Sequence, residues 1–214
     1  TEPAQVGEKR IVVKAPAQLP YLLMVWHAPT LKDWEKDTTP YVLQILAGVM
    51  SGNDSARLQK SLVKTRQIAV NASAGYDAVA RGPGLFMIDA TPAQGQSMAA
   101  LEQAIRAEIA RIQRDGISEA ELARVKAQVI AADVYQRDSL FYQAMQLGEY
   151  VTAGLPPEAL ARRVDKLRAV TAKEVQAAAQ QWLQNDRLSV AELEPQALKP
   201  QARRAAVPGV RHVN

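Results

Sequence analysis

The stretch from Ser51 to Asp77, SGNDSARLQKSLVKTRQIAVNASAGYD, contains a change of periodicity that restricts the fold. Its first residues, SGNDS, break a preceding apolar helix, and Asp54 or Ser55 can cap a second helix that continues through Thr65. The period then becomes two, with apolar or small residues at alternate positions: Val70, Ala72, Ala74 and Tyr76. The stretch therefore predicts a helix followed directly by a half-buried strand.

Two further strands and a buried helix are predicted upstream of this stretch. The strands are Lys9–Lys14 and Pro20–Ala28. The second of them, PYLLMVWHA, is a continuous apolar run, which is typical of a strand covered on both faces. Thr39 and Pro40 supply an N-cap and a first-turn proline for the segment Tyr41–Met50, which is apolar almost all round and therefore predicts a buried helix.

Downstream, the pattern predicts one antiparallel strand, a run of helices and a final strand. The strand Leu85–Thr91 is expected to pair with the strand of the quoted stretch, and Arg187–Leu193 is the last strand. The first helix after Leu85–Thr91 has an apolar stripe at helical spacing: Met98, Leu101, Ile105, Ile109 and Ile112. This order of elements predicts an α+β fold in which the helices are layered against one mixed, largely antiparallel sheet.

Composition and charge are those of an ordinary globular domain. The chain has 214 residues, 48% of them hydrophobic and 22% charged, and its net charge of +4 is weak support for a nucleic-acid partner. No apolar run reaches the length of a membrane-spanning helix, so no membrane insertion is expected. We expect residues 1–8 to be a linker, 9–194 a single domain and 195–214 a C-terminal tail. The start without methionine fits a domain excised from a longer protein.

The residue types that catalysis requires are scarce. The only histidines are His27 and His212, and the chain has no cysteine, so a zinc site with three protein ligands is not expected. Ser51 in GVMSG sits one place too late for a nucleophile elbow and is better explained as a helix stop signal. No glycine-rich phosphate-binding motif is present. The sequence therefore predicts no catalytic residue, metal site or cofactor in this chain.

Three motifs resemble the second, non-metal-binding half of insulinase/pitrilysin-family zinc metallopeptidases, in a bacterial form related to mitochondrial processing peptidase. The quoted stretch resembles the family pattern S-x-R-L followed by (R/K)-x-(L/I)-A. GISEAELARVKAQVIA resembles its G-(I/V)-(S/T)-x-x-E-L motif, and LRAVTAKEVQAAAQQWL resembles its closing (V/I)-T-x-x-(D/E)-V motif. The resemblance extends over roughly residues 9–194.

This resemblance implies a non-catalytic half of a zinc metallopeptidase. It would enclose an extended peptide substrate and pack against a catalytic half that carries His-x-x-Glu-His and the zinc ion. The alternative is a non-enzymatic assembly protein of the same fold, such as a core subunit of a respiratory complex. The family's many exported bacterial members, together with the lack of cysteine, favour a periplasmic location.

The resemblance also points to specific positions. In supportive second halves, an arginine and a tyrosine seven residues later reach the bound peptide, and those positions are Val63 and Val70 here. We expect both valines to pack in the core. Tyr76 and Arg66 are the candidates for a replacement substrate contact.

Overall fold

The computed structural model describes residues 5–136 and 138–197, so the predicted tail from 198 onward, with His212, lies outside the described residues. The strands are β1 (Lys9–Pro16), β2 (Tyr21–Ala28), β3 (Ala69–Tyr76), β4 (Gly84–Pro92) and β5 (Leu188–Gln196). The α-helices are α1 (Thr39–Ser51), α2 (Met98–Asp115), α3 (Glu119–Gln136), α4 (Leu140–Thr152), α5 (Pro157–Ala169) and α6 (Ala172–Trp182). A π-helical turn, η1 (Gln59–Thr65), precedes β3, and a 3₁₀ turn, η2 (Asn185–Arg187), precedes β5.

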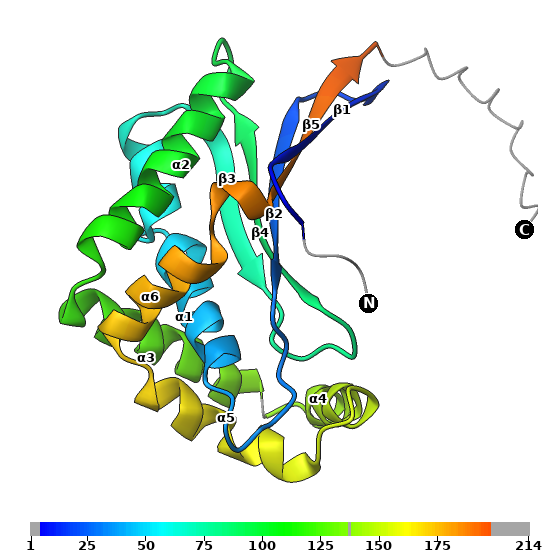
Figure 1. The fold of residues 1–214 in the computed structure, drawn as a ribbon, viewed down its shortest axis with the longest axis vertical. Coiled ribbons are helices and arrows are strands. Elements are labelled where there is room, and N and C mark those ends of the chain that lie inside the picture. Colours follow the sequence, from blue (N-terminus) through cyan, green and yellow to red (C-terminus); the bar gives the residue numbers. More distant parts are fainter. Residues whose placement is uncertain (1–4, 137, 198–214) are drawn as a thin grey trace, which may run out of the picture.

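The strands form one five-stranded sheet in the order β1-β5-β2-β4-β3 (Figure 1). Only β1 and β5 pair in parallel, and the other three pairings are antiparallel. The predicted α+β class and the mixed, largely antiparallel sheet are therefore confirmed. β5 lies between β1 and β2, so the last strand of the sequence joins the first two.

The helices cover one face of the sheet and leave the other face open (Figure 1). Leu22, Met24 and Trp26 of β2 are completely or almost completely buried on the helix side, together with Phe86 and Ile88 of β4. The prediction that β2 is covered on both faces was wrong, because the alternate residues of this strand are partly or fully exposed. Apolar side chains occupy both faces of β2, so its sequence cannot distinguish a covered face from an uncovered one.

Two glycines shape the helix layer. A Cβ atom at Gly48 of α1 would lie 2.8 Å from Cγ1 of Val125 on α3, so the two helices can approach closely only with glycine there. Gly116 ends α2 with φ of +69°, and its N–H donates to the carbonyl of Ile112. The predicted stripe of α2 faces the core, with Leu101, Ile105, Ile109 and Ile112 buried, which confirms that helix.

A β-bulge changes the phase of β3 at its start. The pairing of β3 with β4 shifts its register between Ala69 and Asn71, so that Ala69 is buried and Val70 is 60% exposed. The expectation that Val70 packs in the core was therefore wrong. The extra residue turns Val70 away from the face to which Ala72 belongs. Val63, on η1, is half-buried and packs against the core.

The two sides of α2 give a direct test of this packing. Replacing the fully buried Ile105 by alanine should lower the free energy of unfolding by about 2–5 kcal/mol, because it leaves a cavity. Gln103→Ala, on the exposed side of the same helix, should change it by no more than about 0.5 kcal/mol. Urea unfolding of the two variants measures the difference, and equal losses would contradict the assigned helix orientation.

Candidate functional site

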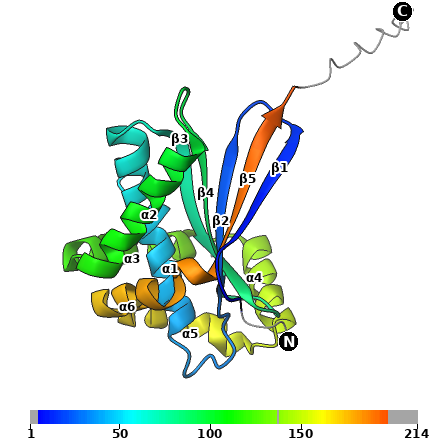
Figure 2. The same cartoon turned by 45° about the horizontal axis from the view of Figure 1, so that its top comes forward.

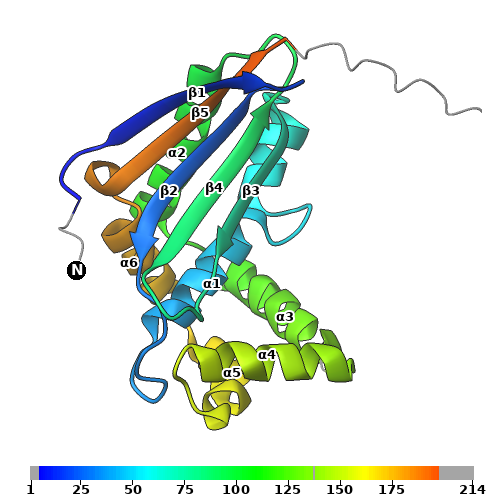
Figure 3. The ribbon, with the colours of Figure 1, turned by 90° about the vertical axis from the view of Figure 1, so that its right-hand side faces the viewer.

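The uncovered side of the sheet is the first candidate surface, and we call it the open face (Figure 3). Its apolar residues come from four neighbouring strands: Ile11, Val13, Leu23, Val25, Leu85, Met87 and Leu193. Cross-strand pairing joins them, since Val25 lies opposite Met87 and Ile11 lies opposite Ala191. Ile11 is 58% exposed and Met87 is 39% exposed. A contiguous apolar surface of this kind marks a site of association with another molecule or domain.

Polar groups on the open face lie on its β3 and β4 side and near the ends of the other strands. Ser73 of β3 donates a hydrogen bond to the carboxylate of Asp89 on β4. Burial and the neighbouring Asp89 carboxylate raise the pKa of Tyr21 above its usual value. His27 is exposed at one end of this face, where its cross-strand partner is Leu85. The polar residues thus border an apolar centre.

Helix α4 provides a second exposed apolar surface, the α4 face. Its members recur at helical spacing and are 41–82% exposed: Leu140, Phe141, Met145, Leu147 and Val151. Figures 1 and 2 show α4 below the end of the sheet and displaced toward the side of the open face. A groove of about 480 Å³ between α4 and α5 adds Leu160 and Pro157 to this surface. Helix α4 itself therefore lies on the side of the molecule that carries the open face.

The opposite side of α4 is held by buried groups. Tyr150 and Gln146 point into the domain and are only 2% and 5% exposed. Burial raises the pKa of Tyr150 to about 12. Beneath them, Arg163 of α5 forms an ion pair with the buried Asp133 of α3 at 2.7 Å. Because breaking a buried ion pair is costly, this contact fixes α5, the helix on which α4 packs.

The outer edge of β3 is closed by side chains from neighbouring elements. The hydroxyl of Ser51, at the end of α1, accepts a hydrogen bond from the N–H of Ala74 at 2.7 Å and donates one to its carbonyl at 2.9 Å. The amide of Gln59, on η1, donates to the carbonyl of Ala72 at 2.8 Å. These bonds occupy main-chain groups that would otherwise pair with another strand.

The four positions predicted from the resemblance are distributed over η1, the residue after it and the two ends of β3. Val70 lies at the start of β3 and Tyr76 at its end. Arg66 is exposed directly after η1, and its N–H donates to the carbonyl of Ser61 at 2.9 Å. Sequence reasoning missed the open face and the α4 face. The exposed apolar residues of α4 were visible in the sequence as a stripe, but a stripe alone does not show whether it is covered.

The hydroxyl of Tyr76 is used within the domain. It donates to the carbonyl of Pro29, and the ring stacks on Phe86 with 6.3 Å between ring centres. Burial, with a smaller effect of Asp77, raises the pKa of Tyr76 well above its usual value. These contacts give Tyr76 a clear structural role at the end of β3.

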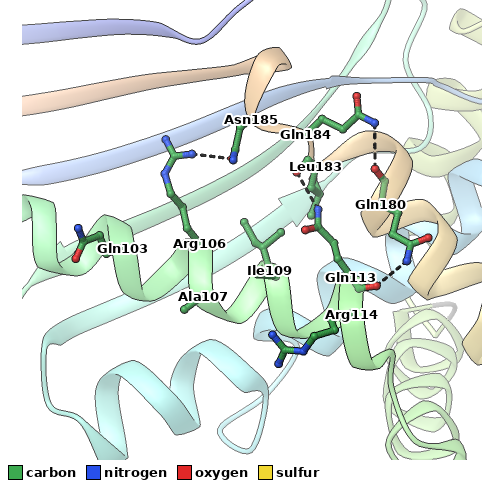
Figure 4. Close-up of a pocket in the computed structure, with 11 residues that line it drawn as sticks. Gln103, Arg106, Ala107, Ile109, Gln113, Arg114, Gln180, Leu183, Gln184 and Asn185 are labelled. Carbon is green, nitrogen blue, oxygen red and sulfur yellow. Dashed lines mark hydrogen bonds between the residues drawn. The ribbon is translucent and has the colours of Figure 1, made fainter.

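A further groove is lined by amide side chains that donate hydrogen bonds to main-chain carbonyls (Figure 4). It measures about 820 Å³ and lies between α2 and the segment from α6 to η2. The amide of Gln113 donates to the carbonyls of Ala179 and Leu183, which caps the end of α6. Arg106 donates to the side chain of Asn185 at 2.7 Å. The polar groups of this groove hold the helices together.

The described residues do not form a zinc site. Within residues 5–136 and 138–197, no three histidine, aspartate or glutamate side chains lie where they could hold a metal ion together. In the same part of the chain, no helix is both long and apolar enough to cross a lipid bilayer.

Tyr76 gives a prediction on alkaline stability. Tyr76→Phe removes one half-buried hydrogen bond and should lower the free energy of unfolding at neutral pH by about 0.5–1.5 kcal/mol. The pKa of Tyr76 is raised in the folded state, so its contribution is complete below the unfolded pKa of about 10 and is lost as pH rises further. Denaturant unfolding between pH 7 and 11 should therefore show a steeper alkaline loss for the wild type. Parallel curves would contradict this role for the hydroxyl.

The fold and these surfaces can be compared with known proteins. A family model described as the peptidase M16 inactive domain matches residues 1–129. No curated protein matches the sequence. A protease from Helicobacter pylori has a TM-score of 0.82 at 18% identity, over 90% of this chain and 46% of that one. The inactive peptidase domain of a candidate zinc protease from Bordetella parapertussis has a TM-score of 0.75 at 19% identity, over 89% of this chain and 98% of that one.

A chain of complex III from Candida albicans shares the fold as well, with a TM-score of 0.72 at 17% identity over 86% of this chain and 45% of that one. This chain therefore spans about half the length of the Helicobacter and Candida chains. The family model covers more than half of the sequence, and its description agrees with the motif resemblance and with the lack of a metal-binding cluster among the described residues. The chain belongs to the family of peptidase M16 inactive domains.

Proposed function

We propose that this chain is the non-catalytic half of a zinc metallopeptidase, which packs against a catalytic half and helps to enclose an extended peptide. The zinc ion and the His-x-x-Glu-His motif belong to the catalytic half in this proposal. The observation that carries it is the pair of uncovered apolar surfaces, the open face and the α4 face, with helix α4 lying toward the side of the open face. An exported, periplasmic enzyme remains part of the proposal on the resemblance and the lack of cysteine.

The two surfaces suit a partner of the same fold. Such a partner would carry its own open sheet face and its own exposed helix. Placing Phe141 and Leu140 of this chain on the partner's sheet, and the partner's helix on Val25 and Met87, would remove both apolar surfaces of each domain from water. In such an arrangement an approximate twofold axis relates the two domains, and the same helix-on-sheet contact is formed twice.

A second function has an observation in its favour. The similarity to a chain of complex III supports a non-enzymatic assembly protein, in which the same two surfaces would pack against a subunit without peptidase activity. The two functions differ in the partner. A partner with His-x-x-Glu-His and peptide hydrolysis by the complex support the peptidase half, and a partner with neither supports the assembly protein.

The α4 face gives a test of the packing. Phe141→Asp should weaken binding to the catalytic half by more than about tenfold, because a charge would enter an apolar contact centre. The free energy of unfolding of this chain should change by no more than about 0.5 kcal/mol, because Phe141 is 79% exposed. Binding is measured by calorimetry with the separately purified catalytic half.

The matched control is Ala107→Asp, which adds the same charge to the exposed side of α2, away from both surfaces. Its affinity for the catalytic half should stay within about twofold of the wild type. Unchanged affinity of Phe141→Asp would remove α4 from the interface. The same weakening in both variants would show that only net charge is being measured.

A further inference from the structure

β1 forms the second edge of the sheet, and this edge is open. Figure 3 shows β5 on one side of β1 and no strand on the other. Three consecutive apolar residues, Ile11, Val12 and Val13, are 58%, 51% and 47% exposed there. Among the described residues, the main chain of β1 forms hydrogen bonds only toward β5. An exposed apolar edge strand is a template for pairing with another extended chain.

The pairing with β5 tells which main-chain groups point outward. The N–H of Ala17, just after β1, donates to the carbonyl of Gln196 on β5. Alternate residues of a strand direct their main-chain groups to the same side, so those of Arg10, Val12 and Lys14 point away from β5. Pro16 is the next outward position, where a missing N–H costs no pairing with β5. The open edge therefore offers three outward N–H groups.

The two edges of the sheet differ in this respect. At β3, Ser51 and Gln59 occupy the outward groups of Ala74 and Ala72. At β1, no side chain among the described residues does so. A row of alternating donors and acceptors is complementary to an extended main chain and to few other ligands.

We propose that the outer edge of β1 binds an extended peptide segment by strand addition. This rests on the proposed function for the identity of the peptide, a segment of the enclosed substrate. The main chain of the peptide pairs with Arg10, Val12 and Lys14. Alternate peptide side chains then lie beside Ile11 and Val13 on the open face, and the others lie beside Val12 on the helix side. Recognition would favour β-branched or other apolar residues and depend little on exact sequence.

A second copy of this chain fits the edge less well. Two copies of β1 can pair in the antiparallel direction through all three outward N–H groups only if Val12 of one copy lies opposite Val12 of the other. That register places Arg10 opposite Lys14 at both ends. Each is paired with carboxylates of its own chain, but like charges directly opposite one another are less favourable than the neutral side chains that a peptide can present there. A peptide of different sequence avoids this repulsion, which is why we assign the edge to a peptide.

The test uses the 214-residue chain and a blocked eight-residue peptide in which valine alternates with threonine and glutamate. NMR should show shifts and slower hydrogen exchange for the amides of Arg10, Val12 and Lys14 when the peptide binds. Val12→Pro removes one outward N–H without touching the pairing with β5, and should weaken binding by about tenfold or more. Val12→Thr, which keeps the N–H, should bind within about twofold.

A second measurement does not depend on the folding of the proline variant. The same peptide with N-methyl groups at every residue has no main-chain N–H to donate on either of its edges, and it should lose binding to the wild-type chain. Equal binding of the methylated peptide, protection of Ala72 and Ala74 in place of β1, or no binding at all would overturn the proposal. Self-association of the wild type that Val12→Pro abolishes would assign the edge to a second copy.

These outcomes are independent of the proposed function. Peptide binding is measured on this chain alone, whereas the proposed function depends on binding to the catalytic half through the α4 face. If the peptide does not bind but the chain still binds the catalytic half, only the strand-addition site is ruled out. If the chain does not bind the catalytic half but still binds the peptide, it is a peptide-binding domain with another partner.

Discussion

The contact between one face of the sheet and the helix layer is the interaction on which the rest of the domain depends. Leu22, Met24 and Trp26 of β2 meet Phe86 and Ile88 of β4 and the helices above them. Full burial of such a side chain contributes roughly 1.5–3 kcal/mol. Every helix of the core packs either on this face or on another helix of the layer. The opposite face therefore receives no cover from the described chain. The open face is thus a direct consequence of how the core is built.

Much of the fold could be predicted from local pattern, and the errors have identifiable causes. The apolar stripe of α2 is a local signal, and it is found in the structure. The exposure of Val70 depends on a β-bulge, which is set by pairing with β4 and leaves no mark in a strand whose residues are mostly small. The open side of β2 depends on which helices return to the sheet, which is a property of the whole chain.

The candidate site was harder to predict because it is a surface and not a motif. The scarcity of histidine and cysteine directed attention away from metal and thiol chemistry and offered no motif in its place. The positions inherited from the family pattern, Val63 and Val70, carry no polar group, so they could indicate only what is missing. The features that the structure adds are relations between elements: α4 displaced toward the open face, and Ser51 bonded to a strand that begins eighteen residues after it.

The bonds that Ser51 and Gln59 make to β3 have a consequence for how this domain behaves at high concentration. A sheet with two free edges can add neighbours at both ends and grow without limit into a filament. Here Ser51 and Gln59 occupy outward groups of β3, so among the described strands only β1 offers a free row of main-chain groups, and an extended chain added there finds no second free edge on which growth could continue. The hydrogen bonds that Ser51 of α1 and Gln59 of η1 make to the far strand β3 thereby leave β1 free for strand addition while opposing fibre growth through the other edge.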